Sequence, residues 1–393
     1  MRDQLELPRF KGATGWEFTD LGAFDLDAFG PAPADAELTL PEPLFEASGI
    51  SLTQVDAHSE AGEAGPDGVI VMALGVAAQE HPELVEPHLG TIVPADDIFV
   101  AANDAGWSCG AFVYVPRGVR VSSPILLNAV TAAAGTALQR RVLIVLEEGA
   151  EAEVWEQYLS ADGESETLLN TVVELVVGQN AKLRYICGQD LNEKSWIFGA
   201  QRAEVQRDGK LDWVAAGFGS ARGRVRMETK LAGDGAEGKV TGAYVPHGRQ
   251  HVDFDTTQEH AAPNTFSDLA FRGILAGRSS AVWRGVIKVD PGAQQTDAFQ
   301  ECRNLLLSKR AHVDAIPGLE ILANDVRCTH AAAIAQIDKD QLFYLRSRGL
   351  PDPQAQRLVI EGFMAELVER FEEGQTREIL AGALERRLAV VLD

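Results

Sequence analysis

The chain has 393 residues, of which 46% are hydrophobic and 24% are charged, so its composition is that of a globular protein able to bury a large core. Its 58 acidic residues against 35 basic ones give a net charge of −23, which argues against nucleic acid and an anionic membrane surface as partners. Residues 1–100 contain 19 Asp and Glu against 3 Lys and Arg, which predicts a separate acidic unit.

Four cysteines are scattered through the chain and form no Cys-x-x-Cys motif: Cys109, Cys187, Cys302 and Cys328. This low density is typical of a reducing compartment. The first residues lack the basic-then-apolar order of a signal peptide. The longest uncharged stretch, 121–139, is broken by polar residues, Pro and Gly, and predicts strands and turns rather than a membrane span. We therefore expect a cytoplasmic protein that does not contact a membrane.

Residues 1–95 combine short helical patterns with breaks that are rich in proline. Four prolines, Pro31, Pro33, Pro41 and Pro43, predict an extended connection. Segment 68–88 contains enough Ala, Val and Leu for a helix. We expect residues 1–95 to form a small acidic N-terminal domain that is rich in helix.

Residues 96–337 alternate apolar and polar side chains, for example in 142–147, 211–214 and 281–289. A period of two predicts strands with one buried face. Turn glycines recur 29, 31 and 29 residues apart, at Gly149, Gly178, Gly209 and Gly238. Such a period indicates stacked repeats, because one repeat cannot bury its apolar face alone. The pattern favours a β-solenoid, with a large sandwich or barrel as the alternative.

Residues 338–393 predict three helices. The first begins at Asp338, with Gln341 in the capping-box position, and ends near Gly349. The second opens at Asp352-Pro353. The apolar stripes of the last two helices consist of Ile360, Phe363, Met364, Leu367 and Phe371, and of Leu380, Leu384, Leu388 and Val391. Three short helices cannot bury all of these among themselves, so we expect part of this surface to dock on a partner.

Two motifs resemble enzyme signatures, but the residues in or around each motif do not fit the enzyme class. The Gly-x-Ser-x-Gly pattern of hydrolases occurs at 106–110, but that motif needs a strand before it and a helix after it. Here 103–104 predicts a turn before the motif and 111–115 a strand after it. Segment 233–239 resembles the start of a phosphate-binding loop, but Val240 stands where Mg²⁺ binding needs Ser or Thr. We therefore expect no catalytic residues and predict that the chain alone is not an enzyme.

Five polar residues gather within 14 positions: His247, His251, Asp253, Asp255 and His260. Alternation in a strand would place His251, Asp253 and Asp255 on one face, where they could bind a metal. The alternative, which we favour, is a hydrogen-bonded polar ladder along a solenoid.

Cys328-Thr-His330 is a stronger candidate for metal ligands than the polar cluster at 247–260. In a strand, residues two apart project to the same face, so a thiol and an imidazole would lie side by side as a pair suited to zinc or iron. Two ligands are too few for a closed site, so others must come from elsewhere or from another chain. The alternative is a buried cysteine beside a hydrogen-bonded histidine.

In its motifs the chain resembles the SufB/SufD family of the SUF iron–sulfur cluster assembly system, and particularly its SufD branch. The resemblance rests on segments 288–300, 304–308, 319–330 and 341–349, which include Cys328-Thr-His330 and a Phe-Tyr-Leu-Arg-Ser-Arg-Gly run. Segment 107–118 resembles the strand that opens the core domain of that family. The motifs are specific in combination, and the likeness covers roughly residues 100–350.

The resemblance implies a mainly β fold. A right-handed parallel β-helix core at 96–337 would lie between an N-terminal helical domain at 1–95 and a C-terminal helical domain at 338–393. It also implies two partners, a SufB-like scaffold protein on the core and a SufC-like ABC-type ATPase on the C-terminal helices. A homodimer of the chain alone is the alternative to the complex with a SufB-like partner.

The resemblance further implies a metal site shared between two chains. A nascent Fe–S cluster would form between the SufB-like and SufD-like chains, with a cysteine of the SufB-like chain and His330 of this chain as ligands. Our own hypothesis for Cys328 is that it is an auxiliary ligand or a group that contacts a ligand. The cluster would be transient, and the isolated chain would hold no cofactor tightly.

The chain departs from the family pattern after His330. Where the family usually continues Gly-Ala-Thr-Val-Gly, this chain has Ala331-Ala-Ala-Ile-Ala335, so we expect the loop beside the histidine to sit differently. Cys302 stands where SufB-like chains can carry a cysteine, which leaves a SufB-like subunit as an alternative. Two further alternatives are a β-helical carbohydrate-active enzyme, with acids such as Asp253 and Asp255 in a cleft, and a purely structural solenoid.

Overall fold

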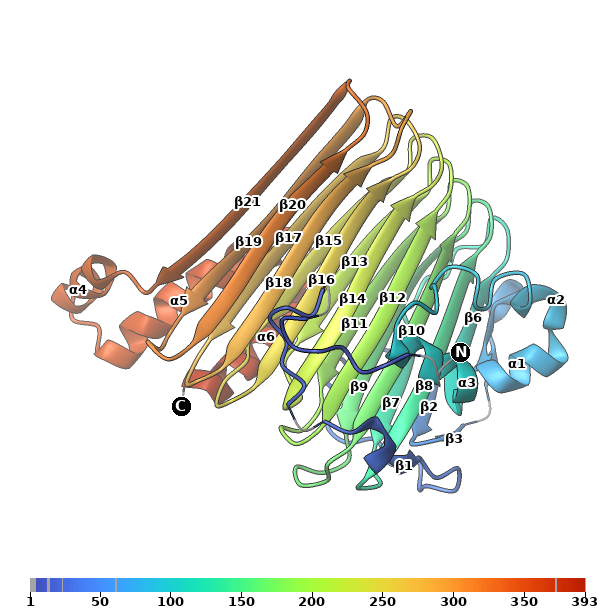
Figure 1. The fold of residues 1–393 in the computed structure, drawn as a ribbon, viewed down its shortest axis with the longest axis horizontal. Coiled ribbons are helices and arrows are strands. Elements are labelled where there is room, and N and C mark those ends of the chain that lie inside the picture. Colours follow the sequence, from blue (N-terminus) through green and yellow to red (C-terminus); the bar gives the residue numbers. More distant parts are fainter. Residues whose placement is uncertain (1–4, 13–14, 23, 61, 372, 393) are drawn as a thin grey trace.

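The structure, a computed structural model, describes residues 5–392 except 13, 14, 23, 61 and 372. Its centre is a parallel β-solenoid of about eight turns, with helices at both ends of the chain (Figure 1). Successive strands alternate between two sheets, so that each turn contributes one strand to each sheet. The predicted mainly β fold, with a solenoid between helical regions, is confirmed.

The strands of sheet A are β4 (Glu63–Ala64), β5 (Ile70–Ala73), β6 (Cys109–Val115), β8 (Thr136–Leu146), β10 (Leu168–Val177), β12 (Trp196–Val205), β14 (Arg222–Leu231), β16 (His251–His260), β18 (Ser280–Val289) and β20 (His312–Ile321), with β1 (Gly30–Pro31) beside β8. The strands of sheet B are β3 (His58–Ser59), β2 (Ser51–Val55), β7 (Ile125–Thr131), β9 (Glu151–Ser160), β11 (Lys182–Asp190), β13 (Lys210–Gly217), β15 (Glu237–Tyr244), β17 (Phe266–Leu275), β19 (Thr296–Leu306) and β21 (Val326–Gln336).

The length of one turn follows from the ladder of sheet B. Glu151 pairs with Lys182, Lys182 with Lys210, and Lys210 with Glu237, so one turn takes 31, 28 and 27 residues. The predicted repeat is therefore confirmed. Three of the four repeat glycines lie in turns from sheet A to sheet B, but Gly238 lies inside β15. The turn before β15 is formed instead by Gly235, whose φ of +71° suits glycine.

Alternation along each strand fills the interior of the solenoid. In β18, Ala281, Trp283 and Ile287 are buried, whereas Arg284 and Lys288 lie on the outer face, where they form ion pairs. Aromatic rings from successive strands stack inside with centroids 5.5 to 6.4 Å apart: Tyr244, Phe254, Phe271 and Trp283. These rings join neighbouring turns into one continuous apolar core.

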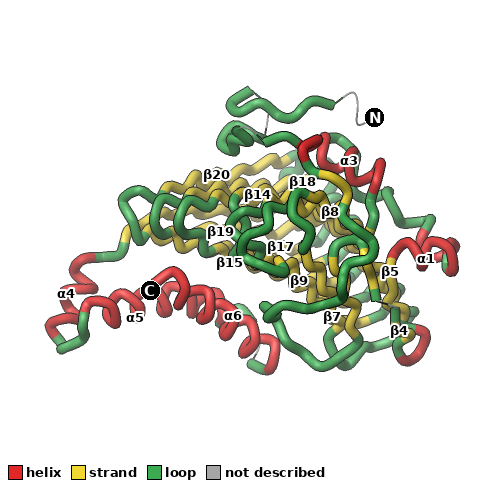
Figure 2. Tube along the Cα trace, turned by 90° about the horizontal axis from the view of Figure 1, so that it is seen from below, coloured by secondary structure: helices red, strands yellow, loops and turns green. Residues whose placement is uncertain are grey.

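The helices are α1 (Leu74–Glu80), α2 (Pro82–Val85), α3 (Ile98–Gly106), α4 (Lys339–Ser347), α5 (Asp352–Val368) and α6 (Gln375–Leu392), with 3-10 turns η2 (Leu26–Ala28) and η3 (Pro66–Gly68). Figure 2 shows that α5 and α6 cover one side of the solenoid, while α3 and the N-terminal segment cover the other. On sheet B, Ile360 and Leu384 are buried with the sheet side chains. On sheet A, Phe24 and Phe99 pack against Phe198.

The predicted N-terminal zone contains strands as well as helices. Helices α1 and α2 fall within the predicted segment 68–88, but that segment begins with β5. Strand β2 pairs with β7 in parallel, and β5 pairs with β6 in antiparallel orientation, so this zone extends both sheets. Strand β2 was not predicted, since five residues show too little alternation. The domain boundary at residue 95 stays a prediction.

The three predicted C-terminal helices are confirmed. The side chain of Asp338 accepts a hydrogen bond from the backbone N–H of Asp340 at 2.8 Å and caps α4. Gly349 ends that helical segment with a φ of +93°, and Pro353 lies in the first turn of α5. Among the described residues, no helix is long and apolar enough to cross a membrane.

Candidate functional site

The two ends of the solenoid differ in their edge strands. At the N-terminal end, the sheets finish in the two-residue antiparallel strands β3 and β4. At the other end they finish in β20 and β21, which have 10 and 11 residues and have a strand neighbour on one side only within the described chain. A long edge strand presents a row of unpaired backbone N–H and C=O groups, with which another chain can pair.

Cys328 and His330 both lie on β21 and face the inner side of the solenoid. In the parallel ladder Cys328 stands beside Ala298 and His330 beside Gln300, and these neighbours are 1% and 0% exposed. Cys328 is only half-buried and His330 is exposed, because no further turn covers them. The prediction that the two side chains share one face of a strand is confirmed.

The two side chains differ in their readiness to bind a metal. Cys328 packs against a small apolar cluster that includes Val289 and Ala298. Partial burial raises the pKa of the Cys328 thiol, and the carboxylate of Asp297 raises it further. The thiol is therefore protonated at neutral pH, and it must lose its proton before it can bind a metal. The imidazole of His330 is exposed and can bind iron directly through a ring nitrogen.

Within the described part of the chain, Cys328 and His330 do not form a closed metal site with other side chains. Over residues 5–392, apart from the few that the structure leaves undescribed, no three His, Cys, Asp or Glu side chains come together in a way that could hold a metal ion. The site offers one nitrogen ligand and one thiol, which is half of a four-coordinate set.

Apolar side chains surround this pair. Leu319, Ile321 and Ile334 are 41%, 39% and 49% exposed. In the ladder Leu319 stands beside Ile287, which is fully buried, so Leu319 occupies a position that one more turn would bury. We call the inner-facing side chains of the last turn the open end, namely Leu319, Ile321, Cys328, His330 and Ile334. Contiguous exposed apolar side chains are typical of surfaces that contact other molecules.

The apolar part of the open end was not predicted from the sequence. The alternation of β20 and β21 resembles that of the earlier strands, so the pattern does not show that these strands are last. The available signal was their position, because the helical zone begins at residue 338.

A second exposed apolar surface lies on the C-terminal helices. Helix α4 projects away from the end of the solenoid (Figure 1). Its Phe343 and Tyr344 are 71% and 57% exposed, and Leu358 on α5 is 49% exposed. These three residues lie outside the predicted apolar stripes, which pack on sheet B of the same chain. Docking of the C-terminal helices on a partner stays a prediction.

The segment after His330 differs from the expectation. Residues Ala331 to Ala335 belong to β21 and continue the ladder with residues 301–305 without interruption. The segment is therefore a strand rather than the expected loop. No residue of this segment has a positive φ, so the segment does not need the glycines of the family pattern.

The other three cysteines are buried inside the solenoid. Burial raises the pKa of Cys187 to about 12 and that of Cys302 to about 11. Burial also raises the pKa of Cys109, although the nearby Arg140 opposes this effect. Cys302 accepts a hydrogen bond from the side-chain amide of Asn304 at 3.3 Å. These thiols are packed and protonated, so they are not available as ligands at the open end.

The polar cluster around β16 is a hydrogen-bonded ladder. His251, Asp253 and Asp255 share the outer face of the strand, as alternation predicts. Arg224 donates a hydrogen bond to Asp253 at 2.6 Å and also contacts Asp255. His251 lies 2.8 Å from the hydroxyl of Ser280, and burial lowers its pKa to about 4. The structure therefore supports the ladder interpretation over a metal site.

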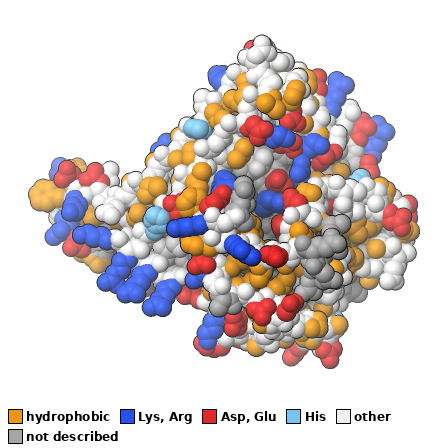
Figure 3. Space-filling model, viewed as in Figure 1, with side chains coloured by type: hydrophobic (Ala, Val, Ile, Leu, Met, Phe, Trp, Pro, Cys, Tyr) orange, Lys and Arg blue, Asp and Glu red, His pale blue; other side chains and the backbone are white. Residues whose placement is uncertain are grey.

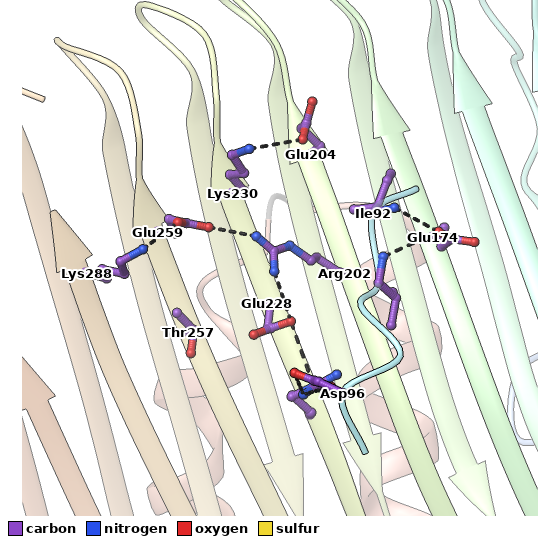
Figure 4. Close-up of polar contacts among 12 residues, drawn as sticks. Ile92, Asp96, Glu174, Arg202, Glu204, Glu228, Lys230, Thr257, Glu259 and Lys288 are labelled. Atoms are coloured by element: carbon purple, nitrogen blue, oxygen red, sulfur yellow. Dashed lines mark hydrogen bonds and ion pairs between the residues drawn. The ribbon is translucent and has the colours of Figure 1, made fainter. Parts of the chain in front are cut away.

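Carboxylates on the outer face of sheet A are held in ion pairs between neighbouring turns (Figure 4). Glu259 lies 2.8 Å from Arg202 and 2.7 Å from Lys288. Asp253 and Asp255, the acids of the carbohydrate-enzyme alternative, are both bound to Arg224, and Asp253 is 2% exposed. A glycosidase needs two carboxyl groups that can reach a sugar, and these two carboxyl groups are committed to Arg224.

The two enzyme-like motifs do not lie in the arrangement of strands and helices that such motifs require. Helix α3 ends at Gly106 and β6 begins at Cys109, so the Gly-x-Ser-x-Gly pattern follows a helix and precedes a strand, the reverse of a nucleophile elbow. The predicted strand is confirmed, but the predicted turn at 103–104 is wrong, because both residues lie inside α3. Segment 232–236 forms the turn between β14 and β15.

Comparisons with known proteins agree with this architecture. The family model "SUF system FeS cluster assembly, SufBD core domain" matches residues 129–363, and the model "SufBD protein N-terminal region" matches residues 53–127. The chain is 32% identical over 343 residues to the iron-sulfur cluster assembly protein SufD of Bacillus subtilis, covering 86% of this chain and 78% of the relative. It is 31% identical over 360 residues to an iron-sulfur cluster assembly SufBD family protein of Synechocystis, covering 87% of this chain and 75% of the relative. A SufBD family protein of Staphylococcus aureus is 28% identical over 313 residues, which cover 79% of this chain and 67% of the relative.

The SufBD core match spans more than half of the chain and coincides with most of the solenoid, including the whole open end. The N-terminal match coincides with the strands that start both sheets. The chain therefore belongs to the SufBD family of the SUF system for iron–sulfur cluster assembly.

Proposed function

We propose that the chain is the SufD-like subunit of a SUF assembly scaffold, and that a SufB-like chain docks on its open end. The observation that carries the proposal is the half-complete ligand pair, Cys328 and His330, inside an uncovered apolar end. A second solenoid seated there would bury Leu319, Ile321 and Ile334 and could pair with the long edge strands. The relative from Bacillus subtilis is named SufD, which favours the SufD-like over the SufB-like assignment.

The nascent cluster is the cargo of this interface. The imidazole of His330 binds iron from this chain, and the partner supplies the remaining protein ligands. Cys328, whose thiol has a raised pKa, joins as an auxiliary ligand once it is deprotonated. A neutral imidazole leaves iron more readily than a thiolate does, which suits a cluster that is passed on. The isolated chain holds no cluster tightly and catalyses no reaction by itself.

The C-terminal helices provide a second docking surface, for a SufC-like ABC-type ATPase. The support is the exposed pair Phe343 and Tyr344 on the projecting helix α4. Closure of the ATPase on nucleotide would pull on α4 to α6 and strain the scaffold interface. The complex works in the cytoplasm, and without its partner two copies of the chain pair through the same open end.

The test is replacement of His330. In cells that depend on this SUF system, His330→Ala should lower the activity of an Fe–S client enzyme at least about tenfold. Replacing a residue that only supports a metal ligand already lowers metal affinity or activity about 10- to 100-fold, and replacing the ligand itself should lower it at least as much. The free energy of unfolding should change by no more than about 0.5 kcal/mol, since the side chain is exposed. Cys328→Ser should have a smaller effect than His330→Ala.

His312 is the matched control. It lies on the neighbouring strand β20 with its side chain 69% exposed, and it contacts Asp314 rather than the open end. His312→Ala should mature clusters as the unaltered chain does. Wild-type client activity with His330→Ala would overturn the ligand role.

A further inference from the structure

The turns from sheet B back to sheet A carry an exposed row of cations. Arg249 lies in the turn before β16, Arg278 in the turn before β18, and Lys309 and Arg310 in the turn before β20. All four side chains are exposed. Lys and Arg side chains gather at the lower left of the molecule, over the lower ends of the last turns (Figure 3). We call these four residues the basic row.

The three turns of the basic row are in direct contact. The backbone N–H of Arg278 donates to the carbonyl of Gly248 at 2.7 Å, and that of His312 donates to the carbonyl of Ser279 at 3.1 Å. Neighbouring strands of a sheet lie about 4.8 Å apart, so the row runs for about 10 Å along the solenoid. Like charges on adjacent strands destabilise a sheet.

The row is not neutralised within the chain. In the described part of the chain, six Lys and Arg side chains have no ion pair, hydrogen bond or ring contact, namely Arg249, Arg278, Lys309, Arg310, Lys339 and Arg377. Four of these six form the basic row. In a protein with 58 acidic and 35 basic residues, unpaired cations on consecutive turns are a local reversal of the overall charge.

The carboxylates next to the row have other partners. Glu193 lies 2.8 Å from His247, Asp190 lies 3.9 Å from Arg387, and Asp314 lies 3.1 Å from His312. The cations of the row therefore face solvent as free charges. Such a patch raises the local concentration of an oppositely charged group and speeds its association.

We propose that the basic row is a docking site for a short acidic segment of a partner protein. The row is only about 10 Å long, which is the length of two or three acidic side chains along a strand or helix. Double-stranded DNA carries one charge per about 1.7 Å, and a membrane presents a still wider anionic surface. Both would extend past the row onto a molecule whose net charge is −23. A short acidic segment can fit within the row and avoid that repulsion.

The test uses a fluorescent peptide with three consecutive glutamates between neutral residues as the probe, with the purified full chain at low salt. The unaltered chain should bind the peptide, and the affinity should fall as salt screens the exposed charges. Arg278→Glu/Arg310→Glu should weaken binding at least about tenfold, since it replaces two attractive contacts with repulsive ones. The neutral variant Arg278→Gln/Arg310→Gln should show an intermediate loss.

Lys339→Glu/Arg377→Glu is the matched control. It changes the net charge by the same amount and also removes two cations without partners, but these lie outside the row. The control should bind the peptide within about twofold of the unaltered chain. Three results would overturn the proposal: no peptide binding by the unaltered chain, equal losses in the row variant and the control, or stronger binding of duplex DNA or anionic vesicles than of the peptide. The proposal does not rest on the cluster-assembly role, because the binding measurement needs neither cluster nor ATPase.

Discussion

At the residue scale, burial decides which polar groups hold the fold and which remain free to bind. Arg140 and Glu156 form an ion pair with both side chains fully buried, across the interior between β8 and β9. Glu156 also accepts a hydrogen bond from the hydroxyl of Tyr185 at 2.5 Å. His330 represents the opposite case, because it occupies an inner-facing position without being covered.

The buried pair gives a stability prediction. Glu156→Gln should lower the free energy of unfolding by about 3 to 5 kcal/mol, because Arg140 would keep its charge in the interior without a carboxylate. Glu151→Gln on the same strand is the control, since Glu151 pairs with Lys182 at 2.9 Å near the surface. That change should cost no more than about 1 kcal/mol. Urea unfolding measures the free energy of unfolding of both variants. Equal losses of stability in the two variants would show that the interior does not depend on the Arg140–Glu156 pair.

At the scale of elements, arginine side chains fasten the C-terminal helices to the solenoid. Arg387 on α6 has a side chain that is only 10% exposed. It donates to the carbonyl of Val245 at 3.3 Å, to the side chain of Gln250 at 3.0 Å and to the carbonyl of Phe218. These acceptors lie where the strands of sheet B end, so the arginine fixes α6 against the ends of several turns.

Loss of this contact should loosen α6 specifically. Arg387→Ala should destabilise the protein by about 1 to 3 kcal/mol, because the buried carbonyl of Val245 loses its side-chain donor. Hydrogen exchange in α6 should become faster, while exchange in the central strands stays slow. Arg377→Ala on the same helix should change the stability by no more than about 0.5 kcal/mol, since Arg377 has no polar partner. Unchanged exchange in α6 of the Arg387 variant would contradict the fastening role.

The elements also show what a sequence can and cannot predict. Long strands such as β18 were predicted because ten alternating residues separate a strand clearly from a helix. The C-terminal helices were predicted because caps and apolar stripes agree. Strand β2 was not, because its identity depends on pairing with β7, which lies about 70 residues later in the chain. Helix α3 was read in part as a turn, because Asn and Asp at 103–104 are common turn formers.

The site was predictable only in part. The spacing of Cys328 and His330 places both on one face without any structure. Their exposure could not be predicted, because it depends on β21 being the last strand of its sheet. The same holds for the basic row, whose members are 29 and 31 or 32 residues apart and meet only when the turns stack.

At the scale of the whole molecule, the solenoid is finished at one end and open at the other. Two-residue strands end the sheets near the N-terminus, and strands of 10 and 11 residues end them near the C-terminus. A stacked-repeat protein needs a polar cap on its terminal repeat to stay soluble. Here the terminal repeat is apolar, and the helices that follow it cover the side of sheet B rather than the end (Figure 2). In the proposed assembly, a SufB-like chain on the open end would supply the missing cover.

The most direct measurement of this account is anaerobic co-purification with iron analysis, after co-expression with the SufB-like and SufC-like proteins of the same cells. The tagged chain should bring down both partners and iron. Ile334→Asp puts a charge into the open end, so it should lose the SufB-like chain and the iron while keeping the ATPase on its helices. Val76→Asp is the control, because Val76 is similarly exposed, at 45%, but lies on α1. Retention of the SufB-like chain and iron by the Ile334 variant at the level of the Val76 control would contradict the account.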